Sequence, residues 1–276
     1  MRTYGQYCPI ARASELIAER WTPIIIRNLL VGCRTFTEIR QGAPGISTAL
    51  LAQRLEMLEH HGVVTATPAP TGRGFTYQLT EMGRALKVVC DAMGQWGARW
   101  LEIEPHHLEP AYVLWATTKL IDVARLPDRT VVARFDLRGV TDRYWLILRR
   151  PHPELCTRGL GYVEDLVVHT DAACLVDIHL TRTSYANAAR SGRLVLDGPP
   201  GLARDFLTWI SPSPFAPFVP GSATANAPTQ AASVGVDAAG QRIGRCETAQ
   251  IGRTSVRSVS SSAGVEPATK TTAAGR

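Results

Sequence analysis

The sequence predicts an α+β protein with two folded domains, at residues 1–102 and 112–218, joined by a linker at 103–111. Three observations lead to this prediction. The first domain consists mostly of capped, amphipathic helical segments, whereas the second mixes strand-like alternation with helices. Residues 219–276 are dominated by Ala, Gly, Ser, Thr and Pro, which favours a disordered tail; a frameshifted extension is the alternative.

The composition, 45% hydrophobic and 20% charged, is that of an ordinary globular protein. No apolar run approaches the roughly 20 residues of a membrane span, and the N-terminus lacks the apolar segment of a secretory signal. The six cysteines are scattered without paired spacing, which argues against a disulfide framework or a zinc cluster. We therefore expect a cytoplasmic protein without a membrane partner, a metal or a cofactor. The net charge of +6, with a basic excess in the first domain, is compatible with a polyanion partner.

Helix-start signals organise the first domain. Thr22-Pro23 predicts a capping hydroxyl before a proline at the first helical position. Thr35–Glu38 fits a capping box for a short helix. After the turn APGI, Ser47 is expected to cap a second helix over 48–61. Two short helices around a Gly-containing turn predict a helix-turn-helix unit.

The second of these helices has the pattern of a recognition helix. Leu51, Leu55 and Leu58 form its buried stripe, so the small and amide side chains near its start point outward. Such side chains suit thymine methyls and adenine edges in the major groove. A solvated surface helix is the alternative. The predicted DNA-contacting residues are Ser47, Thr48, Ala49, Gln53 and Arg54.

Two β-type runs, VVTAT and GFTYQL, follow on either side of PAPTGR. They predict a hairpin whose Gly/Pro-rich tip carries Arg73. A hairpin after a helix-turn-helix is a wing, which would place Arg73 against phosphates or in the minor groove. An ordinary exposed hairpin is the alternative. The first domain is thus predicted to be a winged helix-turn-helix.

Apolar residues in the helix after Thr80 recur at intervals of four and three, which makes a heptad seam. A helix of about 30 Å is longer than so small a domain needs, so we predict a dimer helix; packing within the same domain is the alternative. A two-fold homodimer suits a palindromic operator in double-stranded DNA. The seam contains Met82, Leu86, Val89, Met93, Trp96 and Trp100. The predicted interface residues are Leu86, Val89, Met93 and Trp96.

Seven short segments follow one another in a characteristic order along residues 5–101. They are CP-I-A-R-A at 8–13, ERW at 19–21, F-T-E-I-R at 36–40, PGIS at 44–47, L-x-x-R-L-x-x-L-E-x-x-G at 51–62, Y-Q-L-T-E-M-G at 77–83 and W-G at 96–97. Together they resemble the HxlR-type winged helix-turn-helix regulators. The resemblance implies a dimeric bacterial transcription factor, often a repressor. MarR-type regulators share the architecture but would lack the CP start and the PGIS turn.

Cys8 is the one candidate for thiol chemistry. It precedes Pro9 at the start of the first helix, where amide dipoles can activate a thiol. The resemblance implies a redox role as well, because some HxlR-type regulators sense oxidants or electrophiles through a cysteine at this position. A small packing residue at the dimer interface is the alternative. Cys33 and Cys90 lie on apolar stretches and are expected in the core.

The second domain is predicted to hold one antiparallel sheet with helices on one side. Residues 130–138 alternate cleanly, and YWLILRR reads as their hairpin partner. EDLVVHT is the third strand, 172–192 is helical, RLVLDG is the fourth strand, and 202–210 is the last helix. The inward face of the first strand is expected to be Val131, Ala133, Phe135 and Leu137.

The second domain contains the motif S-Y-A-N-A-A-R-S-G-R-L-V-L-D-G at 184–198, followed by a predicted helix. On these residues the domain, over about 112–212, resembles the sterol carrier protein type two fold. The resemblance implies a pocket for a small apolar ligand between sheet and helices. A filled core in a structural or dimerisation domain is the alternative. The candidate pocket residues are Trp115, Phe135, Trp145 and Phe206.

Three hypotheses about function remain open. The chain contains no GxSxG, GxxxxGK[ST], HExxH or complete GxGxxG, so we predict no enzyme and no catalytic residues. The first hypothesis is a DNA-binding regulator, with a second domain that senses an apolar effector. The second is a lipid or sterol carrier that the winged helix merely dimerises, and the third is a thiol-based redox regulator that uses Cys8.

Overall fold

The structure is a computed structural model that describes residues 3–70, 72–159 and 161–223. All of these residues fall within one compact unit, Met1–Pro228. We refer to residues 3–104 as the winged-helix half and to residues 105–223 as the C-terminal half. The predicted tail, 219–276, lies outside the described residues from position 224 onward. Within the described part, no helix combines the length and the apolar character that crossing a bilayer would require.

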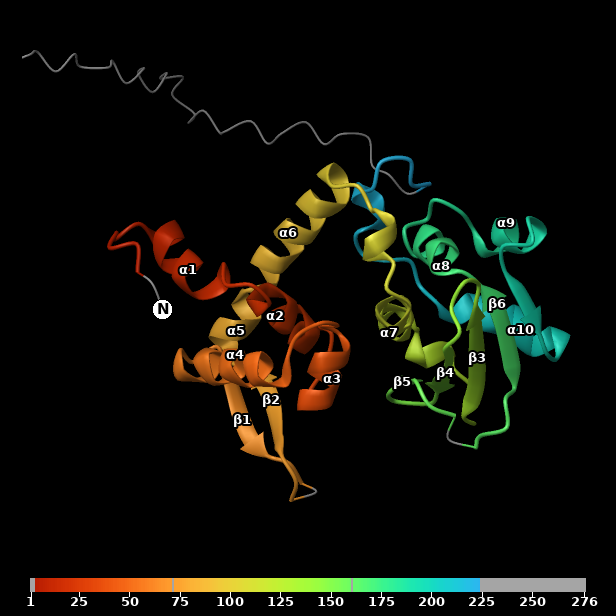
Figure 1. The fold of residues 1–276 in the computed structure, drawn as a ribbon, viewed down its shortest axis with the longest axis horizontal. Helices are drawn as coiled ribbons and strands as arrows, with labels where there is room; N and C mark the ends of the chain where they lie inside the picture. Colours follow the sequence, from red (N-terminus) through yellow and green to blue (C-terminus); the bar gives the residue numbers. More distant parts are fainter. Residues whose placement is uncertain (1–2, 71, 160, 224–276) are drawn as a thin grey trace, which may run out of the picture. The chain divides into compact units, whose positions relative to one another are not determined.

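The winged-helix half has the predicted order of elements (Figure 1). Its core is built around the stripe Leu51, Leu55 and Leu58, which is buried as predicted. The elements are α1 (Pro9–Ile17), α2 (Thr22–Leu30), α3 (Phe36–Gln41), α4 (Thr48–His60), β1 (Val64–Pro68), β2 (Phe75–Leu79), α5 (Glu81–Ala85) and α6 (Lys87–Trp100).

Side-chain caps fix the helix-turn-helix, as the sequence predicts. The Thr35 hydroxyl accepts a hydrogen bond from the Glu38 amide at 3.2 Å, and the Glu38 carboxylate accepts one from the Thr35 amide at 2.9 Å. This reciprocal pair is the capping box of α3. The Ser47 hydroxyl accepts from the Leu50 amide at 3.2 Å and begins α4. Each such cap contributes about 1 kcal/mol to the stability of its helix.

The predicted cap at Thr22 is wrong. Trp21 is the N-cap of α2, and its φ of 77° lies in the left-handed region. This turn carries the chain into α2 one residue earlier than the pattern suggests, so Thr22 lies inside the first turn. Its hydroxyl is buried and has no hydrogen-bond partner.

The long helix predicted after Thr80 is interrupted at Leu86. Thr80 caps α5 as expected, because its hydroxyl accepts from the Gly83 amide at 3.1 Å. The Leu86 amide then donates to the Gly83 carbonyl at 3.2 Å. This bond spans three residues, as in a 3₁₀ turn, and not the four of an α-helix. Helix α6 begins anew at Lys87. A side chain at Gly83 would overlap the Val63 carbonyl oxygen, so α5 packs closely against the segment between α4 and β1.

The C-terminal half begins inside the predicted linker, 103–111. Glu109 caps α7 by accepting from the amides of Ala111 and Tyr112, so part of that linker is the first turn of a helix. The elements of this half are η1 (Pro105–His107), α7 (Pro110–Leu120), η2 (Val123–Arg125), β3 (Val131–Leu137), β4 (Arg143–Leu148), β5 (Glu154–Cys156), β6 (Leu166–Thr170), α8 (Ala172–His179), α9 (Tyr185–Arg190), β7 (Val195–Asp197), α10 (Pro200–Trp209) and η3 (Ala216–Phe218).

The sheet is mixed, and the prediction of an antiparallel sheet is wrong. Its strand order is β5-β4-β3-β6-β7, of which Figure 1 shows β5, β4, β3 and β6 in sequence. All neighbours pair antiparallel except β3 and β6, which are parallel. The alternation in EDLVVHT is the same for either direction, so the pattern alone could not decide it. The three-residue β5 was too short to predict.

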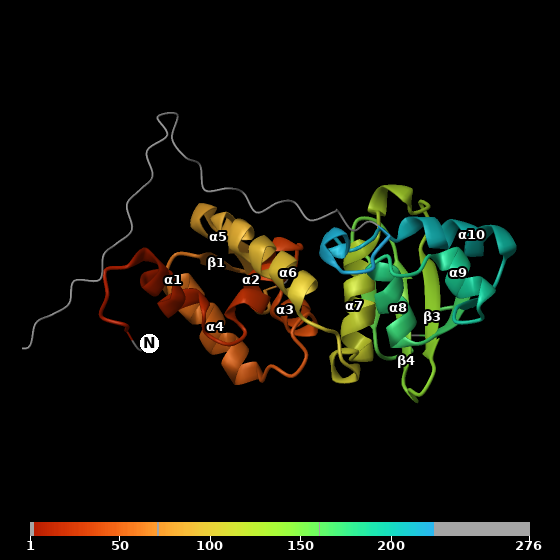
Figure 2. The same ribbon diagram turned by 90° about the horizontal axis from the view of Figure 1, so that it is seen from above.

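Helices cover one face of this sheet, as predicted. Val131, Ala133, Phe135 and Leu137 are buried on that face, and the Phe135 ring lies 6.3 Å from the ring of Phe206 on α10. Helices α7 and α8 lie side by side in both views (Figures 1 and 2). On the opposite face the Arg134 guanidinium donates two hydrogen bonds of 3.0 Å to the Asp136 carboxylate. On the same face Val132 and its cross-strand partner Ile147 are buried, so this side of the sheet is charged only in part.

The packed part of the C-terminal half continues beyond Phe218, where the predicted domain ends. Val219 is buried, and the Ala223 amide donates to the Thr181 carbonyl at 3.0 Å. Phe215 contacts α6, where a side chain at Gly94 would overlap its ring. The chain after α10 therefore returns to the winged-helix half.

Candidate nucleic-acid interface

The N-terminal end of α4 presents a small, polar, exposed surface. Ser47, Thr48, Ala49 and Gln53 are all exposed, on the side opposite the buried leucine stripe. The Ser47 hydroxyl is occupied by the cap of α4, whereas the Gln53 amide has no partner that would hold it back among the described residues. This surface can donate and accept hydrogen bonds and offers methyl groups, which is what reading base edges requires.

Arg54 does not share this exposed surface. Its guanidinium forms an ion pair with Glu19 at 2.8 Å, and its side chain is only 17% exposed. The pair ties α4 to the turn before α2. Of the five predicted residues on this helix, the structure therefore brings four together and turns Arg54 inward.

Arg40 is a basic residue near this surface that the sequence analysis missed. It lies exposed in the last turn of α3, and its Nη1 donates to the Thr48 hydroxyl at 3.3 Å. The signal for it was present, because the first helix of a helix-turn-helix crosses the DNA backbone. A basic residue at its C-terminal end can therefore reach a phosphate.

The predicted wing is present as a two-stranded hairpin. Strand β1 pairs antiparallel with β2, with Val64 opposite Leu79 and Pro68 opposite Phe75. Arg73 lies exposed at the tip between Gly72 and Gly74, whose φ values of 71° and 79° favour glycine. The wing thus holds a guanidinium well away from the domain core, where it can meet a polyanion.

The face of α6 that carries the heptad seam is apolar and exposed. Val89, Met93, Trp96 and Trp100 are all exposed, Trp96 to 58%, and α6 has no buried residue. Leu86 differs, because it packs partly against the core of its own domain. An exposed apolar stripe of this size marks an interaction surface.

Cys8 is the N-cap of α1, and its thiol is half-buried. It makes no capping hydrogen bond, and its neighbour Tyr7 is 98% exposed. Cys33 is fully buried, as expected, and Cys90 is half-buried. Burial raises the pKa of both these thiols, which makes them poor nucleophiles at neutral pH.

The four residues predicted to line a pocket do not come together. Phe135 and Phe206 contact each other in a filled core. Trp145 pairs with Arg134 in the β3–β4 register and lies on the charged face, where its indole N–H donates to Glu164 at 2.9 Å. The aromatic residue opposite Phe135 in the β3–β4 pairing is Tyr144, which precedes the predicted Trp145 by one position.

Trp115 is buried on α7 and stacks on Tyr112, with 5.7 Å between the ring centroids. Its ring packs against the end of α3, where a side chain at Gly42 would overlap it, and not against Phe135 and Phe206. Within the described residues, no group of three or more His, Cys, Asp or Glu side chains is placed to hold a metal ion.

Comparisons with known proteins agree with this geometry in the winged-helix half. The family model described as HxlR-like helix-turn-helix matches residues 16–105. The uncharacterized HTH-type transcriptional regulator YvaP of Bacillus subtilis is 32% identical over 100 residues, which cover 36% of this chain and 93% of YvaP. The HTH-type transcriptional regulator YodB of Bacillus subtilis is 37% identical over 97 residues, which cover 34% of this chain and 87% of YodB.

A solved structure of the reduced form of YodB is also similar, with 35% identity and a TM-score of 0.31, over 35% of this chain and 97% of that one. The matches to these regulators account for about a third of the chain, and the family match stops at residue 105, where the C-terminal half begins. They coincide with the helix-turn-helix, the wing and the helix α6. The chain therefore belongs to the HxlR-like helix-turn-helix family of transcriptional regulators.

Proposed function

We propose that this protein is a dimeric regulator, most simply a repressor, that reads a palindromic operator through two copies of α4. The observation that carries the proposal is the pairing of an exposed polar α4 start with an exposed apolar α6 face in one domain. The first feature suits a DNA groove and the second suits another copy of the chain. A surface helix without a function would explain neither.

Sequence would be read mainly by Gln53. A glutamine amide can form two hydrogen bonds to the N6 and N7 edge of adenine, and Ala49 can contact a thymine methyl. Arg40 and Arg73 flank this surface, on α3 and at the wing tip, and are exposed. Both would contact phosphates or the minor groove, which positions α4 without specifying sequence.

The dimer would form through α6. In a two-fold interface the same stripe is used by both copies, so Val89, Met93 and Trp96 would pack against their equivalents. Such a dimer presents two α4 helices to half-sites about one helical turn, roughly 34 Å, apart. This arrangement predicts an inverted repeat as the operator.

The test is a selection of bound sequences from random DNA, followed by gel shifts over a salt series. Gln53→Ala should relax the preference at one base pair per half-site and cost about 1–3 kcal/mol. Arg73→Ala should weaken binding to all sequences. It should also reduce the slope of the logarithm of the binding constant against the logarithm of salt concentration by about one for each half-site. Gln95→Ala, an exposed change on α6 outside the seam, is the matched control and should bind like the parent.

The proposal would fail if no sequence were enriched, or if Gln53→Ala and Arg73→Ala both bound the selected operator as tightly as the parent. The sign of regulation is tested separately with a reporter gene behind that operator. Removing the regulator should raise expression from a repressed promoter.

For the C-terminal half we propose an effector-binding role with a fold like that of sterol carrier protein type two. What supports the proposal is a mixed five-stranded sheet with helices on one face, in a segment that the family match does not include. The interior between sheet and helices is filled by residues such as Phe135 and Phe206. A carrier that never binds DNA is the alternative, and the same gel shifts would separate the two.

A further inference from the structure

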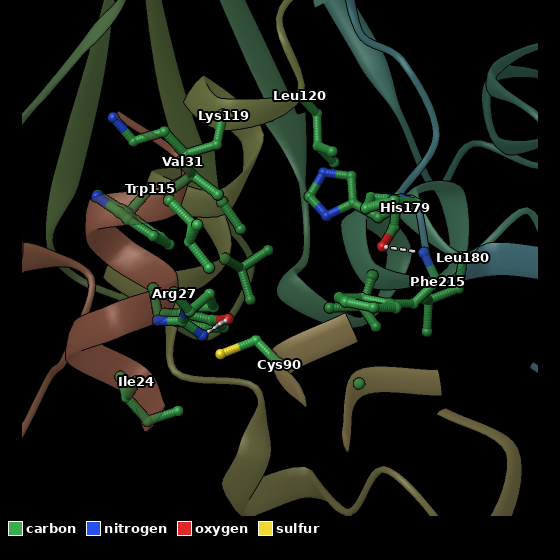
Figure 3. A pocket seen from close by; sticks show the side chains of 18 of the residues that line it. Ile24, Arg27, Val31, Cys90, Trp115, Lys119, Leu120, His179, Leu180 and Phe215 are labelled. Atoms are coloured by element: carbon green, nitrogen blue, oxygen red, sulfur yellow. Dashed lines mark hydrogen bonds between the residues drawn. The ribbon is translucent and has the colours of Figure 1, made fainter. Parts of the chain in front are cut away.

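A cavity of about 760 Å³ lies where the two halves of the molecule meet. Its walls come from α2 and α6 of the winged-helix half and from α7, α8 and the Phe215 segment of the C-terminal half (Figure 3). The volume is within the range of roughly 300–1,000 Å³ that is typical of small-molecule sites. The sequence predicted a pocket elsewhere, between the sheet and its helices.

Most of the wall is apolar. Ile24 lines it from α2, Val31 from the residue that follows α2, Leu120 from α7 and Phe215 from the segment after α10. Figure 3 shows these side chains around the cavity, with the Cys90 thiol directed toward it from α6. An apolar lining contributed by both halves suits a ligand with a sizeable hydrocarbon part, whose burial is worth about 25 cal/mol per Å².

Arg27 supplies a fixed positive charge in this wall. Its Nε and Nη2 donate to the Asn28 side-chain oxygen at 3.1 and 2.8 Å, its Nη2 also to the Gly42 carbonyl at 2.5 Å, and its Nη1 to the Tyr112 hydroxyl at 2.9 Å. The guanidinium lies 5.4 Å from the Tyr112 ring centroid and 5.3 Å from that of Trp115. All these partners are neutral, and one of the five guanidinium N–H groups remains available.

Lys119 adds a second cation from α7. Its ammonium lies 5.6 Å from the Trp115 ring centroid, and among the described residues no carboxylate forms an ion pair with it. The one carboxylate of the cavity wall, on Asp91, is paired with Lys87 at 2.5 Å. The Glu38 carboxylate lies outside the cavity wall and interacts electrostatically with Lys119. The wall itself therefore combines apolar surface with two cations, Arg27 and Lys119, that have no ion-pair partner within it.

His179 of α8 contributes a polar group without charge. It is buried, its Nε2 lies 3.1 Å from the Thr117 hydroxyl, and burial lowers its pKa to about 4. At neutral pH it neither repels a cation nor pairs with an anion, so the charge balance of the cavity rests on Arg27 and Lys119.

We propose that this cavity binds an apolar organic carboxylate, with its carboxylate toward Arg27 and Lys119 and its hydrocarbon part against Val31, Leu120 and Phe215. A carboxylate is favoured over a neutral lipid because a charge-assisted hydrogen bond is about twice as strong as a neutral one. The role of such a molecule as an effector rests on the proposed function, but its binding does not.

The position of the cavity gives the ligand a route to DNA binding. Cys90 and Gly94 of α6 face it, while Trp96 of the same helix lies on the exposed seam. Phe215 packs on Gly94 from the other half. A ligand between these elements can change operator affinity to the extent that it binds the DNA-bound and free dimers differently.

The test compares two probes of matched shape, 2-naphthoate and 2-naphthylmethanol, by isothermal titration calorimetry on the full-length chain. We expect saturable binding of one naphthoate per chain, and binding of the neutral alcohol weaker by about tenfold or more. Lys119→Met should weaken naphthoate binding by about tenfold and leave the alcohol unchanged. Arg204→Met removes an exposed cation of α10 outside the cavity and should change neither.

A second variant tests the location. Ala116 lines the cavity from α7, so Ala116→Phe should fill it and abolish binding of both probes. Circular dichroism establishes that each variant is folded, and Lys119→Met, a change at a half-buried side chain, decides the matter if Ala116→Phe does not fold.

Three outcomes overturn the proposal: no saturable naphthoate binding to the folded parent, equal affinity for acid and alcohol, or naphthoate binding that Lys119→Met leaves unchanged. Gel shifts without any probe test the proposed function on their own. A protein that binds naphthoate as expected but no DNA would therefore contradict the regulator and not the site.

Discussion

The two halves of the molecule treat their apolar residues in opposite ways. In the described residues, most large apolar side chains left exposed belong to the winged-helix half, and the largest group of them lies on α6. The C-terminal half exposes only Tyr162, Val163 and Val195 among its described residues. Apolar residues recur regularly on both α6 and β3. The apolar residues of β3 are buried in the core of the same chain, whereas those of α6 remain exposed to solvent. The comparison shows that the first half leaves an apolar helix face exposed, whereas the second buries its apolar strand face within the same chain.

The largest expected effect is that of Trp96→Glu, which tests whether the exposed face of α6 pairs with a second copy of the chain. If α6 pairs with its copy, two-fold symmetry places two unpaired carboxylates in an apolar interface, at about 3–5 kcal/mol each. The dimer should then dissociate at micromolar concentration and lose its operator affinity. Light scattering on parent and variant measures the effect, with Gln95→Glu on the same helix as the control.

A parent protein that is monomeric at micromolar concentration would contradict this prediction at once. So would a Trp96→Glu variant that keeps the mass of a dimer. In either case the exposed stripe of α6 would need a different partner.

Phe206→Ala tests how much the packed core of the C-terminal half contributes to its stability. Phe206 is 2% exposed and lies between Phe135 and Trp209, with ring centroids 6.3 and 6.0 Å away. Removing a buried phenylalanine side chain costs about 3–5 kcal/mol. Urea unfolding should show a loss of this size, with Val163→Ala, a change at an exposed residue, as the control. A loss below about 1 kcal/mol would mean that this core is not packed as the structure has it.

The same half should be sensitive to acid through His179. Because burial lowers its pKa to about 4 from an ordinary 6.5, the unfolded state takes up a proton before the folded state does. The free energy of unfolding should therefore fall as the pH decreases from about 6.5 to 4 and level off below that. The expected loss is about 3 kcal/mol, at about 1.4 kcal/mol per pKa unit.

Carboxylates also titrate in this range, so the measurement is the difference between the parent and His179→Gln. Glutamine can keep a hydrogen bond to Thr117 but binds no proton. Parallel pH profiles for the two proteins would show that His179 is not the group responsible.

The smallest expected effect concerns Cys8, at the N-terminus of α1. If the thiol is a sensor, it should react with iodoacetamide faster than free cysteine at neutral pH, while buried Cys33 stays unreacted. Cys8→Ser should keep operator binding and lose any response to oxidants. Alkylation at the rate of free cysteine, or an unchanged oxidant response in the variant, would leave Cys8 as a packing residue.

Local signals in the sequence predicted most of the winged-helix half. The capping box at Thr35, the cap at Ser47, the leucine stripe of α4 and the wing all depend on neighbours in the chain, and each is present. Thr22 was wrongly predicted to be the N-cap of α2 because Trp21, the actual N-cap, adopts a left-handed conformation. A bulky residue rarely adopts this conformation, and no local sequence pattern predicts it. The interruption at Leu86 accompanies a close contact of Gly83 with Val63, a tertiary contact that no local pattern predicts.

The candidate sites were predicted less completely, for the same reason. Exposure of Gln53 follows from helix periodicity, but the inward turn of Arg54 depends on Glu19, which is distant in the sequence. The error over Trp145 is one of register, since a shift by one residue moves a side chain to the other face of a sheet. The cavity at Arg27 and Lys119 is built from five separated segments and has no signature in any one of them.

The parallel pairing of β3 with β6 also has a consequence for how the chain is made. On the ribosome, β4 can pair with β3 once residue 148 has emerged, but the other edge of β3 stays open until Leu166–Thr170 follow. An open edge of the apolar strand Val131–Leu137 is a template for pairing with other nascent chains. A translation stop between 148 and 166 would thus yield an aggregating fragment rather than a shorter regulator, which sedimentation of a chain ending at residue 159 would reveal.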